Sequence, residues 1–291
     1  MPIRSSLYFL FDDQISTDFG ITNCSINSGL YNEQFMHSRE VVSTYIRGRS
    51  KPYYQYMKPS PLKLDVILYF DEGFTNTTLK DLAQLFNRDY FVPMIFSDNL
   101  SKIYYVMLSD ESNLIHDGLN GYVELQFVCD DAYAYSPPYT LDYDYSTNPT
   151  FQEIIFNNEG DTDCSPYLTI EKVGNGDINI SQMQVNDMVQ ISTLSKLDDT
   201  YTFDTTDEVE DFINYLTDSE AIYEIEFIFT GLTDGEILTI DNENEIIETS
   251  IPLIYRYDNF NNNFLNLKYG YNYLYVTGTC KLYFEYNFKL L

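Results

Sequence analysis

The sequence predicts a mainly β protein with two domains and few helices. Its clearest strand lies near the C-terminus, where apolar and polar residues alternate over 281–288, the pattern of a half-buried strand. Gly270 and Gly278 bracket the segment before it, where hairpin turns need residues that tolerate positive φ. The 28 Tyr and 20 Phe, with no Trp, are also typical of sheets. The apolar face of the closing strand holds Leu282, Phe284, Tyr286 and Phe288.

The first domain is predicted to contain several strands and one helix. Largely apolar runs predict strands over 64–70, 103–108 and 122–128. Between the first two, a helix is predicted to start at Thr78, its N-cap, and to end near Asn87. The apolar residues of this helix follow the 3.6-residue period: Leu79, Leu82, Leu85 and Phe86. The residues of the third strand that face inward are Val123, Leu125 and Phe127.

The domain boundary is predicted at Pro137 and Pro138, because two adjacent prolines disfavour both a helix and a central strand. We therefore assign residues 1–138 to a first domain and residues 139–291 to a second. With 291 residues, the chain has the length of about two domains, each large enough to fold without disulfides.

The second domain is predicted to be almost entirely strand. Residues 222–229 alternate apolar and acidic side chains, and the turn at Asp234 and Gly235 predicts a hairpin into 236–240. Residues 174–177 predict a second turn of the same kind. One helix is also expected, from a capping-box pair followed by apolar residues at helical spacing: Thr205, Glu208, Val209, Phe212, Ile213 and Leu216.

The chain is strongly and unevenly acidic. Its net charge of −29 predicts repulsion of free nucleic acid, so no sequence-specific nucleic-acid partner is expected. Residues 1–135 hold 10 basic and 17 acidic residues (10 − 17 = −7), whereas residues 136–291 hold 6 and 28 (6 − 28 = −22). This asymmetry favours two domains with different neighbours.

The sequence contains none of the common catalytic motifs that we searched for. The sequence has no G-x-S-x-G, H-E-x-x-H or P-loop pattern, and His37 and His116 are expected to be structural or surface residues. The acidic run 241–245 lacks the spacing of an EF-hand and is interpreted as a solvated turn. We therefore expect no enzyme, no metal and no cofactor.

The four widely spaced cysteines are expected to be reduced core residues: Cys24, Cys129, Cys164 and Cys280. No apolar run reaches the roughly 18 residues of a membrane span, so no membrane partner is expected.

One basic segment stands out in this acidic chain. Between residues 39 and 63 there are six basic residues and a single acid, Glu40, which gives a net charge of +5. An acidic partner surface is the natural target of such a segment. Two alternatives stay open: a solvated hairpin whose basic residues prevent edge-strand aggregation, and phosphate contact with DNA in a channel. The candidate interface residues are Arg39, Arg47, Gly48, Arg49, Lys51 and Lys58.

Several segments, taken in order along most of the chain, resemble one known family. The last of them, residues 260–291, combines an aromatic residue, a Phe-Leu-x-Leu motif, a Gly-x-Asn turn and a Thr-Gly turn. This pattern is similar to the close of phage distal tail proteins, the ring components at the tail tip of long-tailed phages. The earlier segments are 17–21 (TDFGI), 90–98 (YFVPMIFSD) with 103–105 (IYY), 114–118 (LIHDG), 121–127 (GYVELQF), 131–137 (DAYAYSP) and 235–242 (GEILTIDN).

The resemblance implies a fold for each domain. The first would be a split β-barrel, the belt domain, that assembles into a sixfold ring closing the end of the tail tube, singly or as stacked rings. The second would be a galectin-like β-sandwich that projects outward. The loop at 46–50 matches the place of a Gly-Arg loop between two strands of the ring domain. Family members pass more directly from the Gly-Asp-Ile-x-Ile strand to the Gly-Glu turn, so residues about 183–220 are expected to be a helical insertion.

The resemblance also implies a function. It predicts a structural virion protein of the tail tip, assembled in the host cytoplasm, with the tail tube protein, the tail-tip hub protein and peripheral or receptor-binding proteins as partners. The alternative is a carbohydrate-binding adhesin for a host cell-surface sugar, since the family's outer domain resembles galectins and carbohydrate-binding modules. A Tyr ring would then stack on the sugar face.

Overall fold

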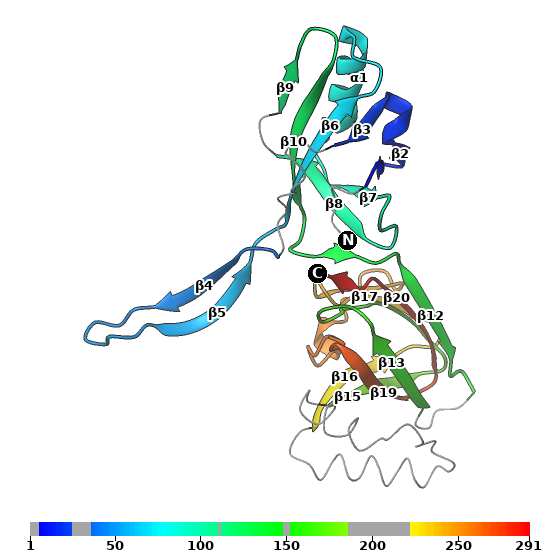
Figure 1. Ribbon diagram of the computed structural model, residues 1–291. Coiled ribbons are helices and arrows are strands. Elements are labelled where there is room, and N and C mark those ends of the chain that lie inside the picture. Colours follow the sequence, from blue (N-terminus) through cyan, green and yellow to red (C-terminus); the bar gives the residue numbers. More distant parts are fainter. Residues whose placement is uncertain (1–5, 25–35, 110–111, 148–151, 186–221) are drawn as a thin grey trace, which may run out of the picture. The chain divides into compact units, whose positions relative to one another are not determined.

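The computed structural model of the chain describes residues 6–24, 36–109, 112–147, 152–185 and 222–291 (Figure 1). It divides into two compact units, Met1–Pro137 with Lys289–Leu291, and Pro138–Phe288. Both units are built mainly from strands, as the sequence predicts. The helix predicted between 205 and 216 lies outside the described residues.

The first unit is built on a ten-stranded sheet that curls into a half-barrel (Figure 1). Its main path runs β2-β1-β7-β8-β10-β6-β3, β9 pairs with β10, and β11 pairs with β8 and β21. The first strands and a 3₁₀ turn are β1 (Phe9–Phe11), β2 (Gln14–Ile15), η2 (Ser16–Phe19) and β3 (Ile21–Asn23). The later strands are β6 (Lys63–Phe70), β7 (Val92–Phe96), β8 (Ile103–Leu108), β9 (Asn113–His116), β10 (Gly121–Cys129), β11 (Ala134–Tyr135) and β21 (Lys289–Leu290).

The core of the half-barrel confirms the strand predictions. The predicted runs 64–70, 103–108 and 122–128 form β6, β8 and β10. Leu125 and Phe127 of β10 are buried and Val123 packs against the same cluster, so this strand faces inward as expected. Aromatic rings fill the centre: Phe11, Phe86 and Phe127 contact one another with ring centroids 5.1–5.8 Å apart.

The helix α1 (Asn76–Phe86) covers this core but starts earlier than the sequence predicts. Its N-cap is Thr75, whose hydroxyl accepts a hydrogen bond from the amide of Thr78 at 3.1 Å, so the prediction of Thr78 as N-cap is wrong. Both residues fit a cap, but Thr75 also places Phe74 and Leu79 at the N′ and N4 positions of a hydrophobic staple. The predicted C-terminal end at Asn87 is confirmed as the C-cap.

The end of the chain also belongs to the first unit. β21 pairs with β11, with Ala134 opposite Leu290 and Tyr135 opposite Lys289. The Lys289 ammonium lies 3.2 Å from the Asp131 carboxylate, which adds an ion pair to this short ladder.

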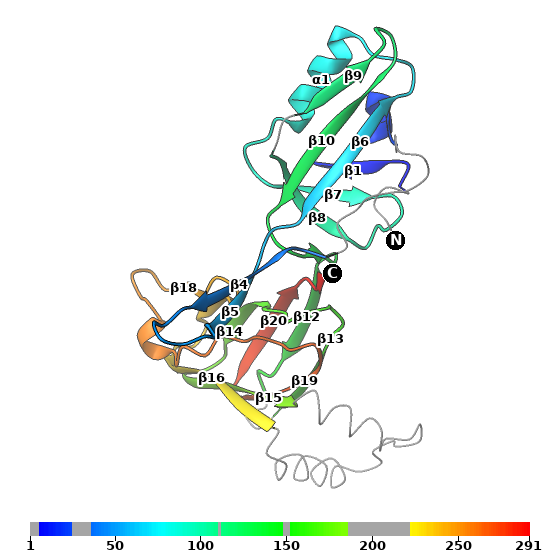
Figure 2. The same ribbon diagram turned by 60° about the vertical axis from the view of Figure 1, so that its left-hand side comes forward.

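The second unit is a sandwich of two antiparallel sheets (Figure 2). A five-stranded sheet runs β12-β20-β14-β17-β18 and a four-stranded sheet runs β13-β19-β15-β16. The strands of the first sheet are β12 (Tyr139–Asp144), β14 (Tyr167–Lys172), β17 (Ile237–Asp241), β18 (Ile246–Thr249) and β20 (Cys280–Tyr286). Those of the second are β13 (Gln152–Asn158), β15 (Gly176–Val185), β16 (Ile222–Leu232) and β19 (Gly270–Thr277), and a 3₁₀ turn, η3 (Tyr257–Asn259), follows β18.

The core of the sandwich follows the predicted alternation. Leu282, Phe284 and Phe288 are buried while Lys281 and Tyr283 are exposed, so the closing strand has the predicted inner face. Phe227 and Phe229 of β16 are fully buried on the opposite sheet. Each wall therefore contributes every second side chain to a shared apolar core.

Three predicted hairpins are wrong. The turns at 173–175, 233–236 and 278–279 each join a strand of one sheet to a strand of the other, so the joined strands do not pair. A Gly turn reverses the chain, but it does not decide whether the two strands lie side by side or face each other across a core. In this unit burial decides between these two arrangements. The two strands joined by each turn both have one apolar face, and the two faces are buried against each other when the strands lie in opposite sheets.

These crossing turns pack closely together at one end of the sandwich. A Cβ at Gly278, where φ is +102°, would lie 2.5 Å from the carbonyl oxygen of Asp177, so only glycine fits there. The Asp177 carboxylate accepts from the amide of Gly231 at 2.8 Å. The buried Lys172 ammonium donates to the carbonyl oxygens of Val173 and Thr279, each at 3.0 Å. Polar contacts therefore hold all three crossings to one another.

Candidate interaction surfaces

The basic segment forms a two-stranded arm of the first unit. β4 (Arg39–Thr44) pairs with β5 (Tyr53–Pro59), and within the described part of the chain neither strand joins another sheet (Figures 1 and 2). All seven residues of β5 are exposed. We call residues 39–59 the arm. An isolated two-stranded ribbon buries little apolar surface and has little stability of its own.

The tip of the arm presents most of the predicted interface residues. Gly48 adopts φ +93° in the turn, and the amide of Arg49 donates to the carbonyl of Ile46 at 3.1 Å. The Arg49 guanidinium lies over the Tyr53 ring, 4.2 Å from its centroid, a cation–π contact that fixes the side chain. The tip therefore holds Arg47, Gly48, Arg49 and Lys51, all exposed.

Arg39 and Lys58 lie apart from this group, at the base of the arm. Arg39 is opposite Pro59 and Lys58 is opposite Glu40. Among the described residues, none of the five cations of the candidate interface forms an ion pair with an acidic group. Their charge is therefore free to meet an acidic group on another molecule.

The arm also exposes large apolar side chains, which the sequence analysis did not single out. Tyr45 is 75% exposed and Tyr54 63% exposed, and Val41, Ile46 and Tyr56 are more than half exposed. The sequence carries a signal for this feature in the run Tyr53-Tyr54-Gln55-Tyr56-Met57, which lacks the alternation of a half-buried strand. Tyr and Arg are the residues most enriched in protein interfaces.

The base of the arm is fixed to the half-barrel. His37 is buried and packs edge-on against Tyr133, with ring centroids 5.1 Å apart. The amide of Ser60 donates to the carbonyl of Ser38 at 2.8 Å, and Leu62 exchanges backbone bonds with Cys129 and Asp131. His37 therefore has a structural position. His116 likewise packs against Phe74, with centroids 5.4 Å apart.

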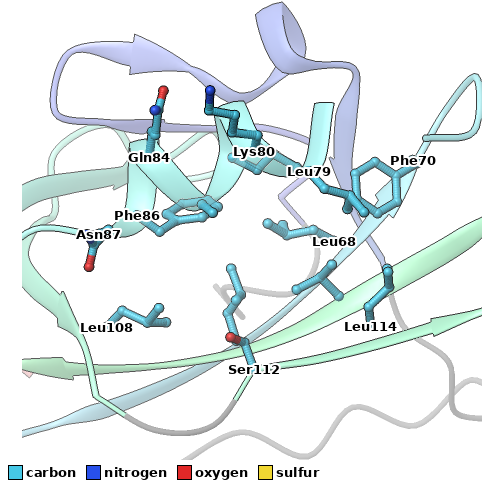
Figure 3. A pocket seen from close by; sticks show the side chains of 14 residues that line it. Leu68, Phe70, Leu79, Lys80, Gln84, Phe86, Asn87, Leu108, Ser112 and Leu114 are labelled. Atoms are coloured by element: carbon cyan, nitrogen blue, oxygen red, sulfur yellow. The ribbon is translucent and has the colours of Figure 1, made fainter. Parts of the chain in front are cut away.

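A cavity of about 580 Å³ lies between α1 and the strands of the half-barrel (Figure 3). Leu68, Phe70, Leu79 and Phe86 form its apolar wall, and Lys80, Gln84 and Asn87 stand at its rim. The lining among the described residues is mainly apolar, which is typical of an incompletely filled core.

The described residues hold no cluster of three or more His, Cys, Asp or Glu that could bind a metal. In the turn 241–245 the Asp241 carboxylate accepts from the amides of Glu243 and Asn244, at 3.1 and 3.0 Å. Partial burial alone would raise the pKa of Asp241, but a hydrogen bond from the Asn244 side chain, together with those from the two amides, lowers it. The turn is an Asx-type turn. It joins β17 to β18, which pair with each other, and Glu243 to Glu245 are exposed, so the interpretation as a solvated turn is confirmed.

The four cysteines are free thiols. Cys129, Cys164 and Cys280 are buried and Cys24 is half-buried. Burial raises the pKa of Cys129 to about 12, so this thiol is protonated and unreactive at neutral pH. No helix in the described ranges has the length and apolarity to cross a membrane.

The outer face of the five-stranded sheet carries exposed tyrosines. Tyr167 and Tyr283 are both exposed, and Tyr283 lies between Asp142 and Thr169 in the register. Rings of this kind can stack on a sugar face. Sugar binding by the second unit stays a prediction.

Comparisons with known proteins agree with this architecture. Residues 4–131 match the family described as "Phage tail protein N-terminal domain", and residues 211–286 match "Phage tail C-terminal domain". A curated relative is the SPbeta prophage-derived protein YomH of Bacillus subtilis (strain 168), 26% identical over 290 residues, which cover 99% of this chain and 100% of the relative. The chain is therefore a phage tail protein.

A solved structure shares the fold of the whole chain. The crystal structure of the SPP1 Dit (gp 19.1) protein, described as a paradigm of the hub adsorption apparatus in phages that infect Gram-positive bacteria, matches with a TM-score of 0.59. The identity is 18%, and the match covers 98% of this chain and 99% of that one. The protein is a phage tail protein with a Dit-like fold, and the resemblance seen in the sequence is confirmed.

Proposed function

We propose that the chain is a structural, non-catalytic component of the distal tail that forms a sixfold ring, joins the tail tube to the tail tip and carries peripheral proteins. The first unit forms the ring, and the second faces outward. The arm binds an acidic surface on the adjacent subunit or on the next tail component. The proteins that it contacts are further copies of itself, the tail tube protein, the tail-tip hub protein and peripheral or receptor-binding proteins. Support comes from the Dit-like fold over the whole chain and from the sequence resemblance.

The arm is the observation that carries this proposal. It is an exposed ribbon, fixed at its base, with aromatic side chains and cations that form no ion pair among the described residues, on a chain of net charge −29. Copies of such a chain repel each other at long range, so association requires a local positive surface placed against acid. Each exposed ion pair contributes about 0.2–1 kcal/mol, and six repeats of the interface multiply the effect.

The test is the double variant Arg47→Glu with Arg49→Glu, made in the full chain. We expect it to stay folded and to dissociate at low salt, where the parent remains a ring, in gel filtration coupled to light scattering. The matched control is Lys268→Glu with Lys281→Glu, which changes the net charge equally but lies in the second unit. A double variant that assembles as tightly as the parent across a salt titration would show that the arm is only a solvated edge.

A further inference from the structure

A second exposed apolar surface lies on the second unit, between β18 and η3. Leu253 is 97% exposed and Tyr255 81% exposed, and Ile254 and Tyr257 are each about 40% exposed. We call residues 251–257 the apolar loop. Contiguous exposed side chains of this size on a soluble surface mark an interaction site more often than chance exposure.

A buried ion pair fixes one end of the apolar loop. The Arg256 guanidinium donates from Nε and Nη2 to the two carboxylate oxygens of Glu236, both at 2.7 Å, and the Glu236 side chain has no exposed surface. Arg256 Nη1 also donates to the side-chain oxygen of Asn259 at 3.2 Å. A bidentate pair of this kind specifies both distance and orientation.

The same carboxylate holds the other end of the loop. Glu236 accepts from the hydroxyl of Thr249 at 2.7 Å, and the amide of Ile251 donates to that hydroxyl oxygen at 3.3 Å. Tyr257 accepts from the amide of Ile247 at 2.9 Å. Both ends of the loop therefore converge on one buried group, and the loop is preorganised, which lowers the entropic cost of binding.

The backbone at the tip of the loop is strained while its side chain is left in solvent. Leu253 adopts φ +63°, in the left-handed region that a bulky residue rarely occupies. A glycine there would remove the strain, and the Leu253 side chain is almost fully exposed, so no packing by the described residues offsets it. Strain kept at an exposed apolar residue points to a function for that side chain.

The negative charge of the residues next to the apolar loop favours a partner with a basic surface. Glu245, Glu248 and Asp258 flank the loop and are exposed, whereas Arg256, the one cation within the loop, is neutralised by Glu236. The second part of the chain, residues 136–291, has a net charge of −22. A second copy of this unit and an anionic lipid surface would both be repelled. The basic arm of a second copy would not be repelled, but it is an exposed two-stranded ribbon and does not offer a pocket for Leu253.

We propose that the apolar loop is a docking site for a different tail protein, one that presents an apolar pocket bordered by Lys or Arg. Leu253 and Tyr255 enter the pocket, and the flanking carboxylates face its basic rim. This contact is independent of the arm, so the ring and the docking site can each fail without the other.

Photo-cross-linking in assembled tails tests the partner. The photoreactive residue benzoyl-phenylalanine replaces Leu253 in the full chain, and the cross-linked peptides are identified by mass spectrometry; the control replaces Tyr269, an exposed residue of the same unit outside the loop. We expect position 253 to give about tenfold more cross-links to a different tail protein, at a segment containing apolar residues and Lys or Arg. Cross-links only to another copy of the chain, or a yield no higher than at position 269, would overturn the proposal.

A glycine substitution separates binding from folding. Leu253→Gly removes the exposed side chain and relieves the backbone, so the melting temperature should stay equal or rise. We expect the same variant to weaken binding of the cross-linked protein by about 30-fold or more. The control Asn262→Gly, also at positive φ, should bind as the parent does. If Leu253→Gly bound the identified protein with parental affinity, the loop would not be the docking site.

Discussion

The turn of the arm and the crossing turns of the sandwich both depend on glycine, but the glycines have different structural roles. In the arm, Gly48 joins two strands that pair with each other, and nothing lies within 4 Å of a Cβ added to it. In the sandwich, Gly278 joins strands of two different sheets, and an added Cβ would meet the backbone of Asp177. The arm is thus determined by local contacts and the crossing end by tertiary ones.

This difference separates the part that we propose to assemble from the part that holds the fold. The arm exposes its side chains and adds little to the stability of the unit that carries it. The crossing end buries charged groups, Glu236 with Arg256 and Lys172 among carbonyl oxygens, and tolerates little change. Substitutions at the two places should therefore have effects of very different size.

The largest effect is expected from Glu236→Gln. This change leaves the Arg256 guanidinium buried without its counter-charge, and removing one partner of a buried pair costs about 3–5 kcal/mol of unfolding free energy. Urea unfolding of the full chain, followed by tyrosine fluorescence and circular dichroism, measures it. The control Lys281→Met breaks an exposed pair with Glu171 and should cost less than about 1 kcal/mol.

The same ion pair should make the sandwich sensitive to acid. Burial alone would raise the pKa of Glu236, but hydrogen bonds from Arg256, Thr249 and Thr233 lower it from 4.5 to about 2. Since the folded state then binds fewer protons than the unfolded state, the stabilisation is complete above about pH 5 and is lost as the pH falls toward 2. The expected loss of unfolding free energy over this pH range is about 3 kcal/mol. It is measured as the pH-dependent difference in unfolding free energy between the parent and Glu236→Gln. Parallel curves for the two proteins would contradict the assignment.

Next in size is Gly278→Ala. Its methyl group meets the carbonyl of Asp177 at a positive φ, so we expect a loss of about 2–3 kcal/mol of unfolding free energy. Gly48→Ala is the matched comparison, because φ is positive there too but the space is open. Its effect on global unfolding should stay within about 0.5 kcal/mol, since the strain is confined to the arm. Equal losses at the two glycines would remove the distinction between the two regions.

The smallest effect on stability is expected from shortening the arm. Replacing residues 41–57 with Asn-Gly joins the register pair Glu40 and Lys58 through a two-residue turn. The unfolding free energy should change by no more than about 0.5 kcal/mol. The assembly measured by light scattering should nevertheless be lost. A strongly destabilised variant would mean that the arm supports the half-barrel itself.

Much of the fold could be predicted from the sequence, because strand periodicity is a local property. The alternation over 222–229 and the apolar runs 64–70 and 122–128 correspond to observed strands, and the alternation over 281–288 corresponds to β20, which ends at Tyr286. The pairing of those strands could not be predicted in the same way. The Gly turns at 235 and 278 carry the residues of a hairpin, and only the burial of both strands on opposite walls decides that they cross between sheets.

The candidate interaction surfaces were predictable only in part. The charge anomaly at Arg39–Lys63 located the arm, since a net charge of +5 in an acidic chain is visible without a structure. The apolar loop gave no comparable signal, because Leu253 and Tyr255 look like core residues in sequence. Their exposure follows from the pairing of Arg256 with Glu236, two residues twenty positions apart.

The central claim is that this chain closes into a ring through its first unit. Light scattering coupled to gel filtration of the purified full chain, with electron micrographs of the same fractions, tests it most directly. The account predicts a sixfold particle of about 204 kDa (six times 34.0 kDa), or twice that mass if two rings stack. A 34.0 kDa monomer at every concentration, also in the presence of the tail tube and hub proteins, would contradict it.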